Sequence, residues 1–119
     1  MNEPVTQTDQ GFPKSNRILS RGAFRRVYDS GRKYQARYFT AFVLGNQAEE
    51  SRLGITVTRK IGNSVQRNRS RRLAREVFRK NKWRVPLGID IVINVKRDLS
   101  EADFELLEKD FLGFLERSR

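Results

Sequence analysis

The sequence predicts an α+β domain with a small central sheet of three to four strands and helices packed on it. Three stretches rich in β-branched and aromatic residues indicate strands, and three stretches with apolar residues at helical spacing indicate amphipathic helices. Their order is helix, strand, strand, helix, strand, helix, and the first strand is long enough to be broken in two. The sheet is therefore expected to be mainly antiparallel with one strand–helix–strand crossover, which the general rule makes right-handed.

Composition limits what such a domain can do. The chain has 119 residues, which is enough to bury a core, and it contains no Cys and no His. Disulfides and thiolate metal sites are thus excluded, and the commonest general acid–base and zinc ligand is missing. No apolar run approaches the roughly 20 residues of a membrane span. A formal net charge of +11 indicates a polyanionic partner, with nucleic acid ahead of anionic lipid.

The chain divides into a polar N-terminal stretch and one domain. Residues 1–16 are polar and show no periodicity, so we expect a flexible leader before a single domain at 17–119. The first helix follows Ser20, a good N-cap, with Leu19 and Phe24 placed to form a hydrophobic staple. It ends at Gly31, the expected C′ glycine. Its apolar stripe consists of Ala23, Phe24, Val27 and Tyr28.

Two strands are expected after the first helix. Residues 33–44 predict the long strand, and alternation places Tyr34, Tyr38 and Phe42 on one face of it. Neither face is cleanly polar, so we expect one face to pack in the core and the other to serve the function of the protein. The second strand is expected at residues 52–58, where the alternating apolar residues are Leu53, Ile55 and Val57.

The second helix is expected to be two-faced. Asn63 or Ser64 is its N-cap, and it runs to about Asn81. At about 100° per residue, one arc carries Ser70, Leu73, Ala74, Val77 and Phe78. The opposite arc carries Asn68, Arg71, Arg72, Arg75, Arg79 and Lys82, with Arg69 and Lys80 to one side. One face should be buried while the other presents guanidinium groups.

The last strand and the last helix complete the predicted fold. Residues 89–95 form the strand, with Ile89, Ile91, Ile93 and Val95 on its buried face. The final helix is expected to start at Ser100, where Ser100 and Asp103 form a variant of the capping box. Its core stripe consists of Phe104, Leu107, Phe111, Leu112, Phe114 and Leu115.

The window from Arg59 to Arg84 holds most of the excess positive charge. It carries eleven Lys and Arg side chains against one acid, Glu76. Like charges recur at i,i+4 spacing, which destabilises a helix by roughly 0.2–0.5 kcal/mol per pair. An ordinary solvated face mixes signs, so this pattern favours a face that phosphates neutralise in a complex. The like-charged pairs are Arg67/Arg71, Arg71/Arg75 and Arg75/Arg79.

Residue types within this window favour nucleic acid. Arg binds phosphate in a bidentate manner and also stacks on bases. Asn68 lies in the middle of the basic arc, where its amide can donate to and accept from a base edge or a ribose hydroxyl; a merely solvated amide is the alternative.

Five aromatic residues form a second candidate site. Rings at such spacings are more often core than ligand platform, but exposed rings also hold single-stranded nucleic acid by stacking. The residues alone do not divide the five between the two roles. They are Phe24, Tyr28, Tyr34, Tyr38 and Phe42.

The chain offers little for side-chain catalysis. It has no Ser/His/Asp or Cys/His set and no Gly-rich phosphate loop with its lysine. The acids near one another that could gather a metal bracket a strand exit and a helix start, where acids serve as caps. We therefore expect neither catalytic residues nor a metal site in the protein. The acids in question are Asp90, Asp98, Glu101 and Asp103.

Residues 59–76 closely resemble the signature of the bacterial ribonuclease P protein subunit. That family has a Lys/Arg-x-Gly-Asn stretch leading into an Arg-Asn-Arg helix, continued by a basic pair, an aliphatic residue and Arg-Glu. This chain has Lys60-Ile61-Gly62-Asn63, then Arg67-Asn68-Arg69, Arg71-Arg72, Leu73 and Arg75-Glu76. The resemblance extends from about Arg17 to the C-terminus.

The resemblance implies a function and a division of roles. The family is the protein partner of a catalytic RNA that, with bound Mg²⁺, removes the 5′ leader of precursor tRNA in the cytoplasm. It implies no membrane and no required protein partner, and a left-handed crossover that would break the general rule. The residues facing the RNA subunit would be Lys60, Arg67, Asn68, Arg69, Arg71, Arg72 and Arg75. Phe24, Tyr28 and Phe42 would line a cleft for the leader, with Tyr28 where the family often has Phe; Tyr34 and Tyr38 stay unassigned.

Three other classes compete with this interpretation. A structural RNA-binding protein of ribosomal type would bind RNA without promoting cleavage. A protein-only nuclease is disfavoured by the missing His and the weak grouping of carboxylates. A DNA-binding protein is disfavoured because no helix-turn-helix or zinc-finger spacing is present.

Overall fold

A four-stranded mixed sheet lies at the centre of the molecule. The computed structural model describes residues 17–18, 20–99 and 102–118. Helix α1 (Arg21–Ser30) precedes strands β1 (Arg32–Gln35), β2 (Phe39–Gly45) and β3 (Arg52–Thr56). The 3₁₀ turn η2 (Arg59–Ile61), helix α2 (Ser64–Lys80), the 3₁₀ turn η3 (Lys82–Arg84), strand β4 (Ile89–Val95) and helix α3 (Phe104–Arg117) follow.

The strand order confirms the predicted α+β class. The sheet runs β1-β2-β4-β3, with β1–β2 and β2–β4 antiparallel and β3–β4 parallel. Helix α2 connects the two parallel strands, as a strand–helix–strand crossover requires. The hand of this crossover stays a prediction, and the expected leader at residues 1–16 lies outside the described residues.

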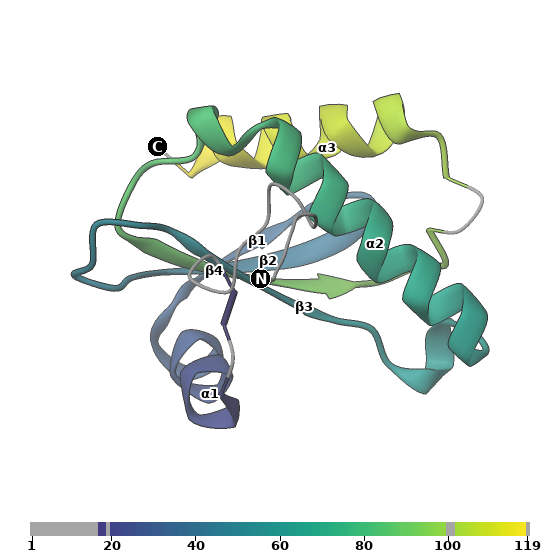
Figure 1. Ribbon diagram of the computed structural model, residues 1–119, viewed down its shortest axis with the longest axis horizontal. Coiled ribbons are helices and arrows are strands. Elements are labelled where there is room, and N and C mark those ends of the chain that lie inside the picture. The colour runs from purple at the N-terminus through teal and green to yellow at the C-terminus, as the bar shows by residue number, and fades with distance from the viewer. Residues whose placement is uncertain (1–16, 19, 100–101, 119) are drawn as a thin grey trace, which may run out of the picture.

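Helices cover both faces of the sheet. Helices α2 and α3 lie on one face and α1 lies on the other (Figure 1). Strand β4 is consequently buried on both sides: Ile91 and Ile93 face α2 and α3, while Val92 packs under α1. The predicted apolar stripe of α1 is confirmed, because Ala23, Phe24, Val27 and Tyr28 all pack in this smaller cluster.

The long first strand is broken in two, and the break corrects the predicted faces. Tyr34 of β1 pairs with Ala41 of β2, so even-numbered residues of β1 share a face with odd-numbered residues of β2. The predicted faces assumed that side chains alternate without interruption from β1 through the turn into β2, and this assumption is wrong. Tyr34 and Tyr38 pack against the α2/α3 side, whereas Phe42 packs on the α1 side.

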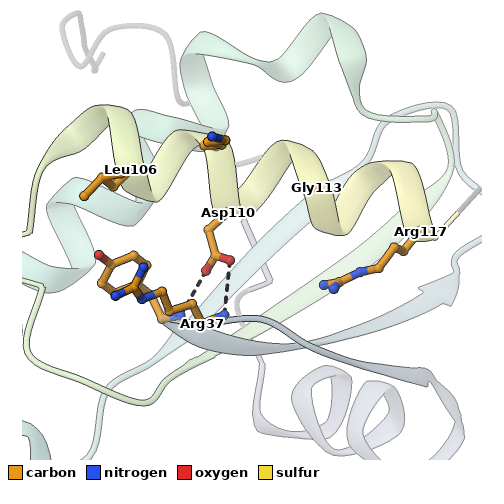
Figure 2. A pocket seen from close by; sticks show the side chains of 7 residues that line it. Arg37, Leu106, Asp110, Gly113 and Arg117 are labelled. Atoms are coloured by element: carbon orange, nitrogen blue, oxygen red, sulfur yellow. Dashed lines mark hydrogen bonds between the residues drawn. The ribbon is translucent and has the colours of Figure 1, made fainter.

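Helix α3 holds the turn between β1 and β2 in place. The Asp110 carboxylate accepts hydrogen bonds from the backbone N–H groups of Arg37 at 3.1 Å and Tyr38 at 2.9 Å (Figure 2). Arg117 Nη2 donates to the Gln35 carbonyl oxygen at 2.7 Å. These contacts line a surface cavity of about 310 Å³ between α3 and the turn, with Arg37, Lys109 and Arg117 around it. Asp110 and Arg117, two of the charged residues that line it, hold the turn, so we assign this cavity a structural role.

The helix ends are capped partly as predicted. Ser20 Oγ accepts from the Ala23 N–H at 3.0 Å and so caps α1, but the Leu19 half of the predicted staple lies outside the described residues. Gly31 follows α1 with a φ of −79°, which any residue can adopt. The predicted end of α1 at Gly31 is confirmed, but Gly31 does not adopt the left-handed conformation usual for a C′ glycine. Glycine is needed here because a Cβ would lie 2.5 Å from the Val27 carbonyl oxygen and 2.9 Å from that of Val43.

Two predicted boundaries are also corrected. Helix α3 begins at Phe104 and not at Ser100, because the Asp103 carboxylate accepts from the Glu105 N–H at 2.9 Å and forms the cap itself. Ser100 lies outside the described residues. Strand β3 ends at Thr56, two residues earlier than predicted, although Val57 remains buried.

The crowding at Gly31 predicts an asymmetric response to alanine. Gly31→Ala should lower the free energy of unfolding by about 1–3 kcal/mol, because backbone must shift to admit the methyl group. Gly113→Ala, in the middle of α3 with nothing within 4 Å of the new Cβ, should raise it by about 1 kcal/mol. Urea denaturation measures both. Equal effects of the two substitutions would contradict the packing argument.

Candidate nucleic-acid interface

Helix α2 begins at a fully formed capping box. Asn63 Oδ1 accepts from the Gln66 N–H at 2.9 Å, and Gln66 Oε1 accepts from the Asn63 N–H at 2.9 Å. Gly62 precedes the box with a φ of 154°, and a Cβ there would collide with the Gln66 side chain. The Lys-x-Gly-Asn stretch is thus explained by local structure: glycine admits the side chain that closes the cap.

The buried arc of α2 is confirmed and fixes how the helix is rotated. Ser70, Ala74, Val77 and Phe78 are buried against the sheet and α3. Ser70, fully buried, accepts from the Leu99 N–H through its Oγ at 3.0 Å. Because a buried hydroxyl needs a partner, this bond resists rotation of the helix about its axis. The opposite arc must therefore face solvent.

The predicted basic residues lie on the exposed arc, but they differ in exposure and in hydrogen bonding. Asn68, Arg69, Arg72 and Arg75 are exposed. Arg71 is half-buried, and its Nη1 donates to Asn68 Oδ1 at 3.0 Å. The Asn68 amide oxygen is thus already engaged in orienting a guanidinium, which leaves the amide N–H₂ as the group free to meet a base or a ribose.

Two arginines of the helix are tied to the protein itself. Arg67 Nη1 donates to the Gly62 carbonyl oxygen at 2.8 Å. Arg79 binds Glu76 through Nε at 3.0 Å and Nη2 at 2.6 Å, and this hydrogen bonding lowers the pKa of the Glu76 carboxyl below its usual value. Glu76 therefore neutralises part of the basic arc near Arg79. Arg75 has no carboxylate partner among the described residues.

Arg75 lies in a repulsive environment. Desolvation of the guanidinium by neighbouring protein atoms, and then the positive charges of Arg17 and Arg71, lower its pKa. Arg17 reaches this place because the segment before α1 forms a parallel bridge with Leu53 of β3. Sequence reasoning missed Arg17, since nothing local in the sequence indicates that a residue so far from α2 joins its basic face. Lys60, in η2, is exposed just before the start of α2.

Three of the five aromatic residues meet on the other side of the sheet. The Tyr28 and Phe42 ring centroids are 4.9 Å apart in an edge-on arrangement, and Lys33 Nζ lies 6.0 Å from the Phe42 centroid. Phe24 packs over Gly54, where a Cβ would lie 2.7 Å from the ring. All three rings are half-buried. We call Phe24, Tyr28 and Phe42 the aromatic layer.

Tyr28 is held by hydrogen bonds as well as by ring packing. Its hydroxyl donates to Asn94 Oδ1 at 2.7 Å and lies 3.0 Å from Thr56 Oγ1. One side chain of α1 is thereby bonded to both parallel strands.

Tyr34 and Tyr38 do not join the aromatic layer. Tyr34 contacts Phe114 with ring centroids 5.5 Å apart, and both tyrosines pack against the larger core. The sheet separates them from Phe42.

Three of the four acids considered for a metal have structural partners, and the fourth, Glu101, lies outside the described residues. Asp90, 3% exposed, accepts from Arg52 Nε at 2.8 Å, Arg52 Nη2 at 2.6 Å and Asn46 Nδ2 at 2.8 Å, and this bonding raises the pKa of Arg52. Asp98 accepts from Gln66 Nε2 at 3.1 Å, and Asp103 caps α3. Among the described residues no three His, Cys, Asp or Glu side chains gather as a metal would need.

The one-sided basic helix on an α+β sheet is typical of a small RNA-binding protein. The family model for ribonuclease P matches residues 12–119. A ribonuclease P protein component from Desulforapulum autotrophicum is 42% identical over 86 residues, which cover 72% of this chain and 74% of that protein. One from Thermotoga maritima is 36% identical over 112 residues, or 91% and 96% of the two chains. The chain belongs to the ribonuclease P protein family.

Solved structures agree with this assignment. The ribonuclease P protein from Thermotoga maritima superposes with a TM-score of 0.78 at 36% identity, over 85% of this chain and 96% of that one. The Staphylococcus aureus protein gives a TM-score of 0.78 at 28% identity, over 89% and 97%. Ribonuclease P is an endoribonuclease of tRNA processing, and the chain is a protein component of this ribonucleoprotein. Among its described residues, no helix is long and apolar enough to cross a bilayer.

The repulsion at Arg75 predicts opposite effects on stability and binding. Arg75→Gln should raise the free energy of unfolding of the free protein by roughly 0.2–0.5 kcal/mol at low salt, because neutralisation removes the desolvation of a charged group and the like-charge repulsion, which together lower the pKa of Arg75. The gain should shrink as salt screens the charges. The same substitution should weaken RNA binding.

Arg72→Gln is the matched control. Arg72 is exposed on the same helix but stands four residues before Glu76, so its loss removes an attraction. Thermal melts at two salt concentrations compare the variants. If Arg72→Gln stabilised the protein as much as Arg75→Gln does, the assignment of like-charge repulsion to Arg75 would be contradicted.

Proposed function

We propose that this chain binds the catalytic RNA of ribonuclease P through α2 and the 5′ leader of precursor tRNA through the aromatic layer. In this proposal the RNA removes the leader and the protein promotes that reaction in the cytoplasm, without a further protein partner. The observation that carries it is the rotation of α2, fixed by its buried arc, which presents Asn68, Arg72 and Arg75 on one exposed face.

Binding of the RNA subunit would use the residues that the family motif assigns. Arg69, Arg72 and Arg75 are exposed, and Asn68 holds Arg71 in position. Arg67 is tethered to Gly62, so we expect it to contact RNA with the remaining donors of its guanidinium. Lys60 extends the same surface beyond the start of α2. Counterion release from several phosphates would supply much of the affinity.

The chemistry of cleavage would belong to the RNA. The chain has no His or Cys, and Asp90, Asp98 and Asp103 each hold structural hydrogen bonds. Mg²⁺ favours carboxylates together with phosphate oxygens, so we propose that it is bound mainly by the RNA component. The contribution of the protein would be to hold the substrate leader and so place the scissile bond.

The aromatic layer is suited to an unpaired leader. Its rings are half-buried, so each is supported by the fold while part of it remains open. Stacking of a base on an aromatic side chain contributes roughly 1–3 kcal/mol. Lys33, beside Phe42, offers a cation for the leader phosphates.

Cleavage of precursor tRNA at low Mg²⁺ tests the proposal. The protein alone should be inactive, the catalytic RNA alone should be slow, and the two together should be faster. The rate of leader release measures all three. Cleavage by the protein alone would support a protein-only nuclease. Tight RNA binding without stimulation would support a structural RNA-binding protein of ribosomal type.

Phe42→Ala tests the aromatic layer. It should weaken binding of precursor tRNA to the holoenzyme while leaving the affinity for mature tRNA unchanged, because only the precursor has a leader to stack. Its effect on unfolding should be small. A loss of about 3–5 kcal/mol would mark Phe42 as core. Phe39→Ala, on the same strand but 2% exposed and in the larger core, is the control that should show such a loss.

A further inference from the structure

The one tryptophan of the chain is exposed at the end of the basic helix. Trp83 lies in η3, directly after α2, and 76% of its surface is accessible. Leaving so large an apolar side chain in water forgoes roughly 1.5–3 kcal/mol of burial. Trp83 belongs neither to the exposed basic arc of α2 nor to the aromatic layer.

The exposure of Trp83 is imposed by a well-anchored turn. Asn81 and Val85, on either side of η3, are each 6% exposed. Asn81 Nδ2 donates to the Val77 carbonyl oxygen at 2.9 Å and to Glu108 Oε2 at 2.8 Å. The Arg84 N–H bonds to the Asn81 carbonyl oxygen at 2.9 Å. With both ends of the turn buried, the backbone of Trp83 is held at the surface.

The sequence neighbours of the ring are cationic. Lys82 and Arg84 flank it, and Arg84 Cζ lies 4.7 Å from the ring centroid. No acidic residue occurs in the sequence between Glu76 and Asp90. An exposed indole with cationic neighbours can stack on a base while the flanking charges meet phosphates.

We propose that Trp83 is a stacking platform for an unpaired base of the catalytic RNA, with Lys82 and Arg84 on the adjoining phosphates. This inference rests on the proposed function, because η3, which carries Trp83, begins two residues after the last residue of the basic helix α2. A second protein copy is a poorer fit, since one exposed indole offers far less than the roughly 800 Å² per partner of a stable interface. An anionic membrane is disfavoured by the same continuity with the RNA-binding helix.

The fluorescence of the native chain reports directly on this site. Trp83 is the only tryptophan, so selective indole excitation observes it alone. Titration with the cognate catalytic RNA should quench this emission saturably, at the same RNA concentration that saturates binding. Emission that stays constant at saturating RNA would overturn the proposal.

Variants separate stacking from charge. Trp83→Ala should weaken binding of the catalytic RNA about tenfold, with the melting temperature and the salt dependence of binding unchanged, because no phosphate contact is lost. Trp83→Phe should restore most of the affinity. Arg84→Gln should instead reduce the salt slope by about one. Leu106→Ala, which removes an apolar side chain 48% exposed on α3, is the control and should bind as the native chain does.

The outcomes distinguish this proposal from the function on which it rests. If the native chain fails to bind or stimulate the catalytic RNA, the proposed function fails. If it binds and stimulates but Trp83→Ala binds equally well, only the stacking proposal fails. An emission shift that depends on protein concentration without RNA, or one that anionic vesicles produce and RNA does not, would assign the ring to a second copy or to a membrane and would overturn it.

Discussion

The burial of one arc of α2 is the constraint on which the functional surface depends. Ala74, Val77 and Phe78 fill the space between the sheet and α3, and Ser70 adds a buried hydrogen bond to Leu99 that sets the rotation of the helix. Apolar burial supplies the stability that like-charged neighbours on the other arc reduce. The protein can therefore keep a repulsive row of guanidinium groups in position before any phosphate arrives.

The sheet divides the molecule into two working sides. The basic helix belongs to the α2/α3 face, whereas the aromatic layer is formed where α1 packs on the opposite face (Figure 1). Strands β3 and β4 belong to both sides, because α2 connects them and Tyr28 is bonded to one residue of each. Ligands on the two sides would thus share a rigid scaffold without sharing contacts.

Periodicity predicted whatever depends on local sequence. The two faces of α2, a cap at Asn63 or Ser64 and the stripe of α1 follow from helical spacing and cap chemistry, and the structure has them, with Asn63 as the cap. Alternation failed for Tyr34 and Tyr38 because the turn before β2 changes which residues share a face, and turn register is a pairing property. Arg17 beside Arg75 could not be predicted, since a tertiary bridge brings it there. The true start of α3 was missed because Ser100 and Asp103 are both acceptable caps in sequence.

The hydroxyl of Tyr28 gives the aromatic layer a property that a phenylalanine would lack. With two polar partners, Asn94 and Thr56, on the paired strands β4 and β3, the hydroxyl end of the ring is held in position. A ring so preorganised loses little torsional freedom when a base stacks on it, so the entropic cost of recognition falls mainly on the flexible nucleic acid. Discrimination among ligands would then depend on how well the bases of each can stack on a fixed ring, and not on a conformational change of the protein.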